Sequence, residues 1–283
     1  MDVRNNGLPL QSKHKAPPFI VAMLEFSRRS RPDAVCLRKQ SSIKGKIMGA
    51  IVSGMTRLPS SFKSNVSRLL EKTLGNFNYM VLLARLGRVN DFSGYEKLIN
   101  YIEANKIYEL KGDFLEIGAF MGGGSTKLAR CARRYNKRLI VIDLFDPDFD
   151  HTQTVHGQPL NSAYRRLLGR KSQREVFDEN TRFEKNIIVY SEDSKLVKLP
   201  ADTELCFSFI DGNHDPEYVM SDFHLAWNAT VPGGIVAFHD YDEAGGILPQ
   251  VTNAVNRLIG LNKCAISNTH CIRETAMMLL RKA

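Results

Sequence analysis

Residues 111–127 read KGDFLEIGAFMGGGSTK and combine an apolar run, a glycine cluster and the start of a helical pattern. The apolar run at residues 114–117 predicts a buried strand, and Gly118 with the glycines at 122–124 predicts a tight turn before a helix that starts at Ser125. Glycine has no Cβ, so the backbone of such a turn can approach a ligand, and the first N–H groups of the following helix point toward that ligand. The stretch therefore predicts a ligand-binding loop at the end of a strand.

The spacing of these residues argues against two common nucleotide-binding loops. A P-loop needs GxxxxGK[ST], and no Gly-Lys-Ser/Thr triplet is present. A dinucleotide fingerprint GxGxxG needs a glycine two residues after Gly118, where Phe120 stands. What remains is an acid, Glu116, two residues before Gly118, with Gly122 four residues further on. This pattern resembles the first motif of class I S-adenosylmethionine-dependent methyltransferases, and a glycine-rich turn in another α/β domain is the alternative.

A second β-rich run, residues 138–143, ends in Asp143, 25 residues after Gly118. Doubly wound folds carry a carboxylate at this point that accepts both ribose hydroxyls of a nucleotide. Further β-rich runs alternate with helical patterns, which predicts a mainly parallel sheet with helices on both faces. We therefore expect an α/β fold, a Rossmann-like doubly wound class I methyltransferase sheet with an antiparallel final strand. The further runs are at residues 186–190, 205–211, 234–239, 263–267 and 275–280.

Residues 1–75 form a distinct, basic segment. They hold 14 Lys or Arg and 4 Asp or Glu, whereas residues 76–283 hold 25 and 26, so the net charge of +9 belongs to the N-terminal part. We expect a helical N-terminal segment up to residue 75 and a methyltransferase domain over residues 76–283. The segment is interpreted as a helical extension packed on the domain or on a second subunit, or as an element that contacts a membrane surface or covers the substrate. A homo-oligomer and peripheral membrane contact are thus open, and no nucleic-acid partner is expected.

The overall composition is that of a soluble globular protein, with 43% hydrophobic and 24% charged residues. No apolar run approaches the roughly 20 residues that span a bilayer, and the N-terminus lacks the apolar core of a signal peptide. The five cysteines are scattered without a CxxC pair, which indicates free thiols in a reducing compartment. We therefore expect a cytoplasmic protein.

Residues 146–185 exceed the length of a normal connection between a strand and a helix. Loops of this length over a ligand-binding edge tend to recognise substrates or act as lids. A basic helical pattern occupies residues 163–177. His151 and His156 are candidate ligands or bases, although loop histidines are commonly only solvated.

Asp211, His239 and Asp240 form a second group of polar residues, each at the end of a predicted strand. Because the carboxyl ends of neighbouring parallel strands meet at one edge of a sheet, these side chains are expected to converge near Gly118. Carboxylates with an imidazole suit Mg²⁺, Mn²⁺ or a related divalent ion, which could hold and acidify a substrate hydroxyl. The alternative is that Asp211 binds the ammonium group of the cofactor, while His239 and Asp240 form a general-base pair without a metal.

Four strings occur in order over about residues 110–245: LEIGAFMGGGSTKLA, VIDLF, FSFIDGNHDPEYVMSDF and VPGGIVAFHDY. They resemble the metal-dependent branch of class I methyltransferases that includes macrocin O-methyltransferase-like and cephalosporin hydroxylase-like proteins. The resemblance implies methyl transfer from S-adenosylmethionine to a hydroxyl of a sugar or other small polar natural product, assisted by Mg²⁺ or another divalent cation. A cephalosporin hydroxylase-like reaction and a non-catalytic cofactor-binding scaffold are the alternatives. Asn213 departs from the family's Ile-Asp-Gly-Asp-His, which removes one carboxylate from the expected metal site.

The resemblance also implies a role for each matching residue. His214, His239 and Asp211 would act in catalysis, with His214 as the candidate general base. The metal would be held by Asp211, His239 and Asp240. The cofactor would be bound by Glu116, Gly118, Ala119, Gly122, Ser125, Asp143, Asp193, Ser194 and Asp211. Of these, Glu116, Gly118 and Gly122 would contact its methionine part, Asp143 its ribose, and Asp193 with Ser194 its adenine.

Overall fold

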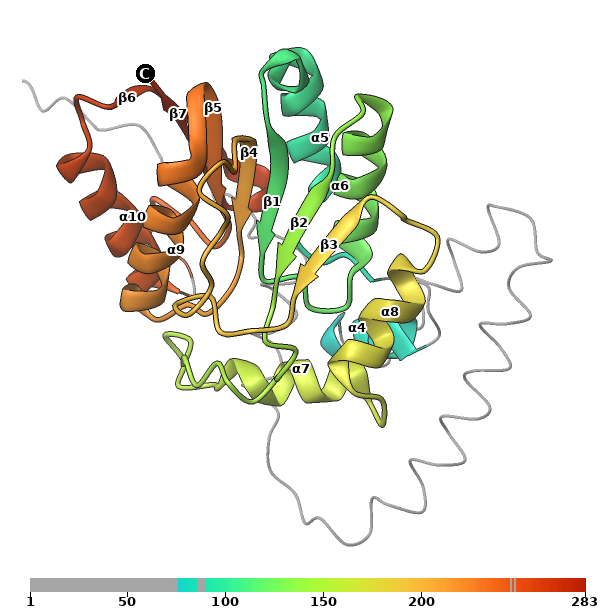
Figure 1. Ribbon diagram of the computed structural model, residues 1–283. Helices are drawn as coiled ribbons and strands as arrows, with labels where there is room; N and C mark the ends of the chain where they lie inside the picture. The colour runs from blue at the N-terminus through green and yellow to red at the C-terminus, as the bar shows by residue number, and fades with distance from the viewer. Residues whose placement is uncertain (1–75, 86–89, 245, 247) are drawn as a thin grey trace, which may run out of the picture.

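The computed structural model describes residues 76–85, 90–244, 246 and 248–283 (Figure 1). The predictions for residues 1–75, including the helical N-terminal segment, lie outside the described residues. Within the described part, no helix is both long and apolar enough to cross a bilayer.

A seven-stranded sheet with the order β3-β2-β1-β4-β5-β7-β6 forms the centre of the domain. The strands β1 to β5 pair in parallel, whereas β7 runs antiparallel to both β5 and β6. This arrangement confirms the predicted doubly wound α/β sheet with an antiparallel final strand. The strands are β1 (Asp113–Ile117), β2 (Leu139–Ile142), β3 (Ile187–Tyr190), β4 (Leu205–Ile210), β5 (Thr230–Phe238), β6 (Ile266–Ile272) and β7 (Met277–Lys282).

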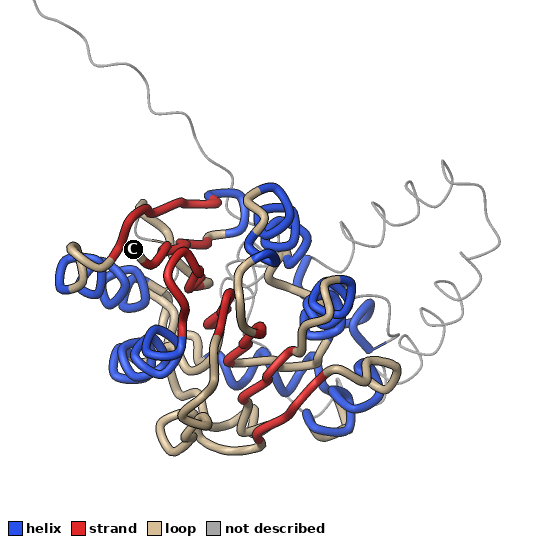
Figure 2. The backbone as a smooth tube through the Cα atoms, turned by 45° about the horizontal axis from the view of Figure 1, so that its top comes forward, coloured by secondary structure: helices blue, strands red, loops and turns tan. Residues whose placement is uncertain are grey.

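Two helical layers cover the two faces of this sheet (Figures 1 and 2). Successive strand residues point to opposite faces, so the neighbours Phe114 and Leu115 of β1 belong to different apolar clusters. Phe114 lies in the cluster that holds the buried residues of α5 (Tyr95–Ala104) and α6 (Gly123–Arg134). Leu115 lies in the cluster that holds the buried apolar residues of α9 (Pro216–Ala229) and α10 (Pro249–Leu261). Both faces of the central strands are therefore buried.

Three helices lie near the carboxyl ends of the strands, at the bottom of Figure 1. They are α4 (Asn76–Arg85), α7 (Leu160–Leu168) and α8 (Gln173–Thr181). The last two belong to the long connection between β2 and β3, for which the sequence predicts one helical pattern over residues 163–177. The structure divides it because Gly169 takes a φ of 72°, and Ser172 and Glu175 then form a capping box that starts α8.

Other boundaries differ from the sequence prediction by a few residues. The helix predicted from Ser125 starts at Gly123, because Gly122 takes a left-handed φ of 75° and ends the turn there. The strand predicted at 263–267 begins only at Ile266, because α10 extends to Leu261 and a turn follows it. Neither shift moves the residues that follow β1, β2, β4 and β5. All four strands run in parallel, so these residues meet at one edge of the sheet.

Candidate active site

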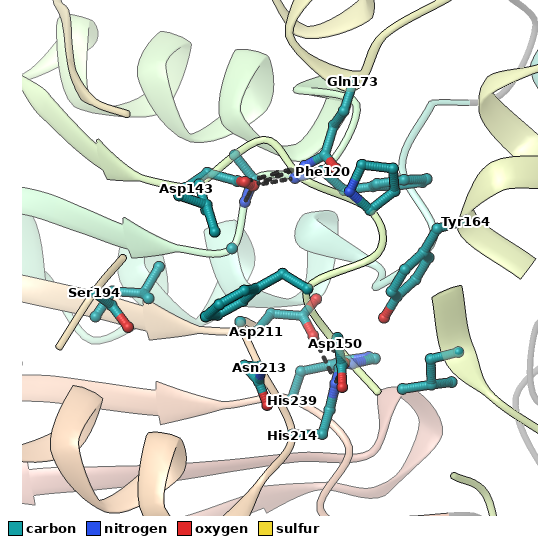
Figure 3. A pocket seen from close by; sticks show the side chains of 18 of the residues that line it. Phe120, Asp143, Asp150, Tyr164, Gln173, Ser194, Asp211, Asn213, His214 and His239 are labelled. Carbon is teal, nitrogen blue, oxygen red and sulfur yellow. Dashed lines mark hydrogen bonds and ion pairs between the residues drawn. The ribbon is translucent and has the colours of Figure 1, made fainter. Parts of the chain in front are cut away.

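A pocket lies across the carboxyl ends of the central strands (Figure 3). Its walls come from the loops after β1, β2, β3, β4 and β5, from the loop before α5, and from the long connection that contains α7. Nine of the residues predicted from the sequence line it. They are Gly118, Ala119, Asp143, Asp193, Ser194, Asp211, His214, His239 and Asp240.

Gly118 brings the loop after β1 against the end of β4. Its φ is +87°, and a Cβ at this position would lie 2.1 Å from the carbonyl oxygen of Asp211. The two strands also bond at this point, because the Asp211 N–H donates to the Ile117 carbonyl at 2.8 Å. No larger residue fits here, so the glycine fixes the distance between the cofactor loop and the group that contains Asp211.

Glu116 lies beneath the pocket and does not line it. Its side chain is fully buried, and its Oε1 accepts a hydrogen bond from the Tyr95 hydroxyl at 2.7 Å. Burial raises the pKa of Glu116 to about 8, although the Ser125 and Tyr95 hydroxyls oppose this. Tyr95, rather than Glu116, lines the pocket. Gly122 lies against Phe177 and Ser125 is fully buried, so neither of them lines it. A cofactor contact by Glu116, Gly122 or Ser125 thus stays a prediction.

Asp143 organises the loop that follows β1. Its Oδ2 accepts from the N–H groups of Ala119 at 2.8 Å and Phe120 at 2.9 Å, and its Oδ1 accepts from the N–H of Phe145 at 2.6 Å. The side-chain amide of Gln173, at the start of α8, lies 3.1 Å from both carboxylate oxygens (Figure 3). Burial raises the pKa of Asp143. The hydrogen bonds that these groups donate act to lower the pKa, but burial has the larger effect. Gln173 is the one side-chain donor among them, so it is the group that a ribose hydroxyl would replace.

The end of the pocket near β3 combines polar and apolar surfaces. The Tyr218 hydroxyl, on α9, donates to Oδ2 of Asp193 at 2.9 Å. Ser194 lies beside Asp193 and also lines the pocket. Leu144, next to the predicted ribose ligand, also lines the pocket and is 37% exposed. A planar base could cover Leu144 and reach Ser194.

His214 stands between two carboxylates at the opposite end. Its Nδ1 lies 2.7 Å from Oδ2 of Asp150, and its Nε2 lies 2.9 Å from Oδ2 of Asp240 and 3.9 Å from Oδ1 of Asp211. Burial alone would lower the pKa of His214, but the hydrogen bonds to Asp150 and Asp240 outweigh it and raise the pKa to about 10. In the metal-free protein this imidazole is therefore protonated at neutral pH.

His239 faces the same two aspartates from β5. Its Nδ1 lies 3.3 Å from Oδ1 of Asp211 and 3.0 Å from Oδ2 of Asp240, yet this buried nitrogen makes no hydrogen bond of good geometry with any described residue. Burial lowers the pKa of His239, and the charges of Asp211 and Asp240 outweigh this effect and raise it well above the ordinary value.

These side chains fit a divalent cation. One ligand atom each from Asp211, His214 and Asp240 lies within 4.8 Å of the others, and the unpaired Nδ1 of His239 adds a fourth donor beside them. The sequence prediction chose His239 as the imidazole ligand, whereas the closest set of three contains His214. Carboxylate oxygens combined with imidazole nitrogens suit Mn²⁺, Fe²⁺ or Zn²⁺ better than an all-oxygen site would.

The loop before α5 orients Asp211. The Ser93 hydroxyl donates to Oδ2 of Asp211 at 2.7 Å, which leaves Oδ1 facing the two histidines. Asp91 holds this loop, because its Oδ1 accepts from the N–H groups of Ser93 and Gly94 and its Oδ2 accepts from Lys127 at 2.6 Å. The hydrogen bond from Ser93 to Asp211 was not predicted from the sequence.

The long connection supplies residues that the sequence reading missed. Asp150 is buried against His214, and Tyr164 of α7 lines the pocket beside Phe120, with ring centroids 5.1 Å apart. The Tyr164 hydroxyl points toward the aspartate and histidine group (Figure 3). Burial, followed by the charge of Asp150, raises the pKa of Tyr164 well above its ordinary value. His151 and His156 are exposed and lie outside the pocket lining.

Comparisons with known proteins agree with this architecture. The family model described as "Methyltransferase domain" matches residues 115–241. No curated protein matches the chain. The solved O-methyltransferase NovP gives a TM-score of 0.53 at 18% identity, over 78% of this chain and 99% of that one. CalS11, described as a TDP-rhamnose 3'-O-methyltransferase in calicheamicin biosynthesis, gives 0.47 at 16% identity, over 79% and 96%.

Residues 115–241 are therefore similar to a methyltransferase domain, and the described part of the chain has the class I methyltransferase fold, as predicted. The narrower resemblance to macrocin O-methyltransferase-like and cephalosporin hydroxylase-like proteins stays a prediction. The match ends at Tyr241, just after the last predicted metal ligand, so it includes each predicted site residue.

Proposed function

We propose that the protein transfers a methyl group from S-adenosylmethionine to a hydroxyl of a sugar or another small polar molecule, with the help of a divalent cation. One observation carries this proposal. The glycine loop and the aspartate and histidine group line the same pocket. Asp211 joins them, because its backbone lies against Gly118 and its side chain lies beside His239. A cofactor-binding end and a hydroxyl-activating end thus lie side by side.

The cofactor end supports S-adenosylmethionine. Bound there, it supplies a methyl group on a sulfonium centre, which an aligned oxygen nucleophile can accept. Asp143 would bind the ribose hydroxyls once the Gln173 side-chain amide has moved away from its carboxylate. The exposed side chain of Leu144 would cover one side of the base. The backbone near Gly118 would face the amino-acid end.

The acidic end supports activation of a hydroxyl. Asp211 and Asp240 with His214 or His239 would hold the cation, which supplies Lewis acidity that lowers the pKa of a bound hydroxyl. Asp211 and Asp240 raise the pKa values of the histidines and would also be ligands of the cation. Protonation of the histidines and binding of the cation therefore compete at this site.

His214 and Asp150 provide a route for the hydroxyl proton. Asp150 accepts the Nδ1 proton of His214 and fixes the ring, so that Nε2 is the nitrogen that faces Asp240 and the pocket. When Nε2 is unprotonated it can take a proton from an acceptor hydroxyl, and Asp150 stabilises the resulting imidazolium. This assignment keeps His214 as the general base, leaves His239 as the imidazole that would hold the cation, and adds Asp150 as the positioning residue of His214.

A screen for methyl acceptors tests the proposal. Purified protein with S-adenosylmethionine and Mn²⁺ would be incubated with a library of sugars, nucleotide sugars and catechols, and release of S-adenosylhomocysteine would be recorded. We expect release with a polyhydroxylated acceptor and a product mass that shows an added methyl group. The Asp240→Asn variant, which keeps the shape of the side chain, should bind the cofactor but release little product. A product that has gained oxygen would instead support the hydroxylase-like reaction.

A further inference from the structure

The side chain of Gln173 occupies the carboxylate that the proposed function assigns to the ribose of the cofactor. Its amide nitrogen lies 3.1 Å from each oxygen of Asp143 (Figure 3). An ionised carboxylate only accepts hydrogen bonds, so the nitrogen of the glutamine amide is the atom that faces it. Gln173 is 5% exposed and lines the pocket. A side chain of the protein itself thus stands where a ligand hydroxyl would bind.

Asp143 has little capacity left for a ligand. A carboxylate offers about four lone-pair positions. The N–H groups of Ala119 and Phe120 donate to Oδ2, and the N–H group of Phe145 donates to Oδ1. These donors belong to the backbone of the loops after β1 and β2, so they stay in place as long as the loops keep their conformation. A ribose hydroxyl can therefore reach the carboxylate only when Gln173 has moved.

The helix that carries Gln173 is held in place by other contacts. The capping box of Ser172 and Glu175 fixes the first turn of α8. Further along the helix, the Asn180 side chain donates to the Met121 carbonyl in the loop after β1, at 2.7 Å. Gln173 is the first residue of α8, and its long side chain can rotate about its own bonds. Displacement of its amide therefore requires rotation of one side chain and leaves α8 where it is.

Gln173 provides a hydrogen bond that Asp143 needs when the pocket holds no ligand. Asp143 is half-buried, and a carboxylate that is shielded from water loses free energy when it loses a donor. A ribose hydroxyl that displaces the amide replaces one donor by another, so its hydrogen bond adds little to the net free energy of binding. The empty protein therefore competes with its own ligand at this carboxylate.

We propose that Gln173 is an internal competitor for the cofactor, which stabilises the empty pocket and lowers the affinity for S-adenosyl ligands. The inference rests on the proposed function, which assigns the ribose hydroxyls to Asp143, and it adds that Gln173 sets how much those hydroxyls contribute to binding. Loss of Gln173 should therefore tighten binding, whereas loss of an ordinary cofactor ligand would weaken it.

Two ligands test the inference without a metal or a methyl acceptor. Calorimetry would compare S-adenosylhomocysteine with the analogue whose ribose lacks both hydroxyls. Gln173→Ala should bind S-adenosylhomocysteine about tenfold more tightly than the unchanged protein does, the factor that one hydrogen bond to a charged group supplies. The affinity for the analogue should stay the same in both proteins, because a ligand without these hydroxyls does not compete for Asp143.

Two further variants separate the hydrogen bond from other effects of the substitution. Gln173→Met fills similar space without a donor, so it should behave like Gln173→Ala. Gln158→Ala removes an amide from the same connection, outside the pocket lining, and should change neither affinity. Both Gln173 variants should unfold at a lower temperature than the unchanged protein when empty, and this difference should shrink at saturating S-adenosylhomocysteine.

Two kinds of result would overturn the inference. One is binding of S-adenosylhomocysteine that is weaker or unchanged in the Gln173 variants, and the other is an equal gain for both ligands. Gln173→Met decides the question if Gln173→Ala does not fold. If the unchanged protein binds neither ligand, the proposed function itself is wrong and this inference falls with it. If the binding pattern is as expected but no acceptor is methylated, the proposed function is wrong and this inference stands.

Discussion

The Nδ1 atom of His214 lies 2.7 Å from Oδ2 of Asp150, a residue 64 positions earlier in the chain. His214 follows β4, whereas Asp150 belongs to the long connection after β2, so this contact ties the connection to the centre of the pocket. The other ring nitrogen of His214 lies 2.9 Å from Asp240. An imidazole held between two carboxylates keeps its proton, and its pKa is raised to about 10 despite burial.

Asp150→Asn should lower the pKa of His214 by about one unit or more, because it removes one of the two charges that stabilise the imidazolium. The change can be followed in the metal-free protein by the pH dependence of the His214 ring signals in nuclear magnetic resonance. Asp148→Asn is the matched control, because Asp148 lies in the same segment but pairs with the exposed Arg165. An unaltered His214 titration in Asp150→Asn would show that Asp240 alone holds the proton.

The sequence predicted the sheet and its strand-end residues because both follow from local patterns. Asp143, Asp211 and Asp240 each follow an apolar run, and parallel strands bring such residues to one edge of the sheet. Asp150 could not be found in this way. It lies in the first part of the connection, before residue 163, which has no strand or helix periodicity, and nothing local distinguishes it from Asp146 or Asp148. Its burial against His214 depends on the path of the whole connection.

Glu116 shows a different limit of sequence reasoning. The motif placed it two residues before Gly118, at the end of β1, but its side chain points to the sheet face covered by α5 and meets Tyr95 there. Alternation along a strand fixes which residues share a face, yet it does not say which face carries the pocket. The same reasoning chose His239 as the metal ligand, whereas the closest set of three ligand atoms includes His214.

Glu116→Gln should flatten the pH dependence of stability. The folded-state pKa of Glu116 is about 8 and its ordinary value is 4.5, so folding favours the protonated acid. The stability contributed is fully present below pH 4.5 and is lost as the pH rises through 8, by on the order of 5 kcal/mol in total. The variant should therefore be more stable than the unchanged protein at pH 8.5. Urea unfolding at pH 5 and pH 8.5 gives the free energy of unfolding of both proteins. An equal loss of stability between the two pH values in both proteins would contradict the assignment.

Asp143→Ala should reduce stability as well as cofactor affinity. The change removes the acceptor of the Ala119, Phe120 and Phe145 N–H groups, which costs about 2 to 4 kcal/mol of the free energy of unfolding. Affinity for S-adenosylhomocysteine should fall by at least about tenfold through the lost bonds to ribose. Thermal unfolding and calorimetry measure the two effects. A variant with weaker binding but unchanged stability would mean that the loop does not depend on this carboxylate.

Asp240→Asn should weaken binding of divalent cations while leaving the backbone in place. Asp240 has a left-handed φ of 56°, which asparagine tolerates well, so the change removes a ligand charge without adding strain. We expect Mn²⁺ to bind the unchanged protein more tightly than Mg²⁺, because imidazoles join the carboxylates, and the variant to lose about tenfold or more in Mn²⁺ affinity. Calorimetry with each cation gives the affinities, and S-adenosylhomocysteine binding near Gly118 serves as the control that should not change. Equal Mn²⁺ affinity in both proteins, or methyl transfer that survives complete removal of divalent ions by EDTA, would rule out the metal.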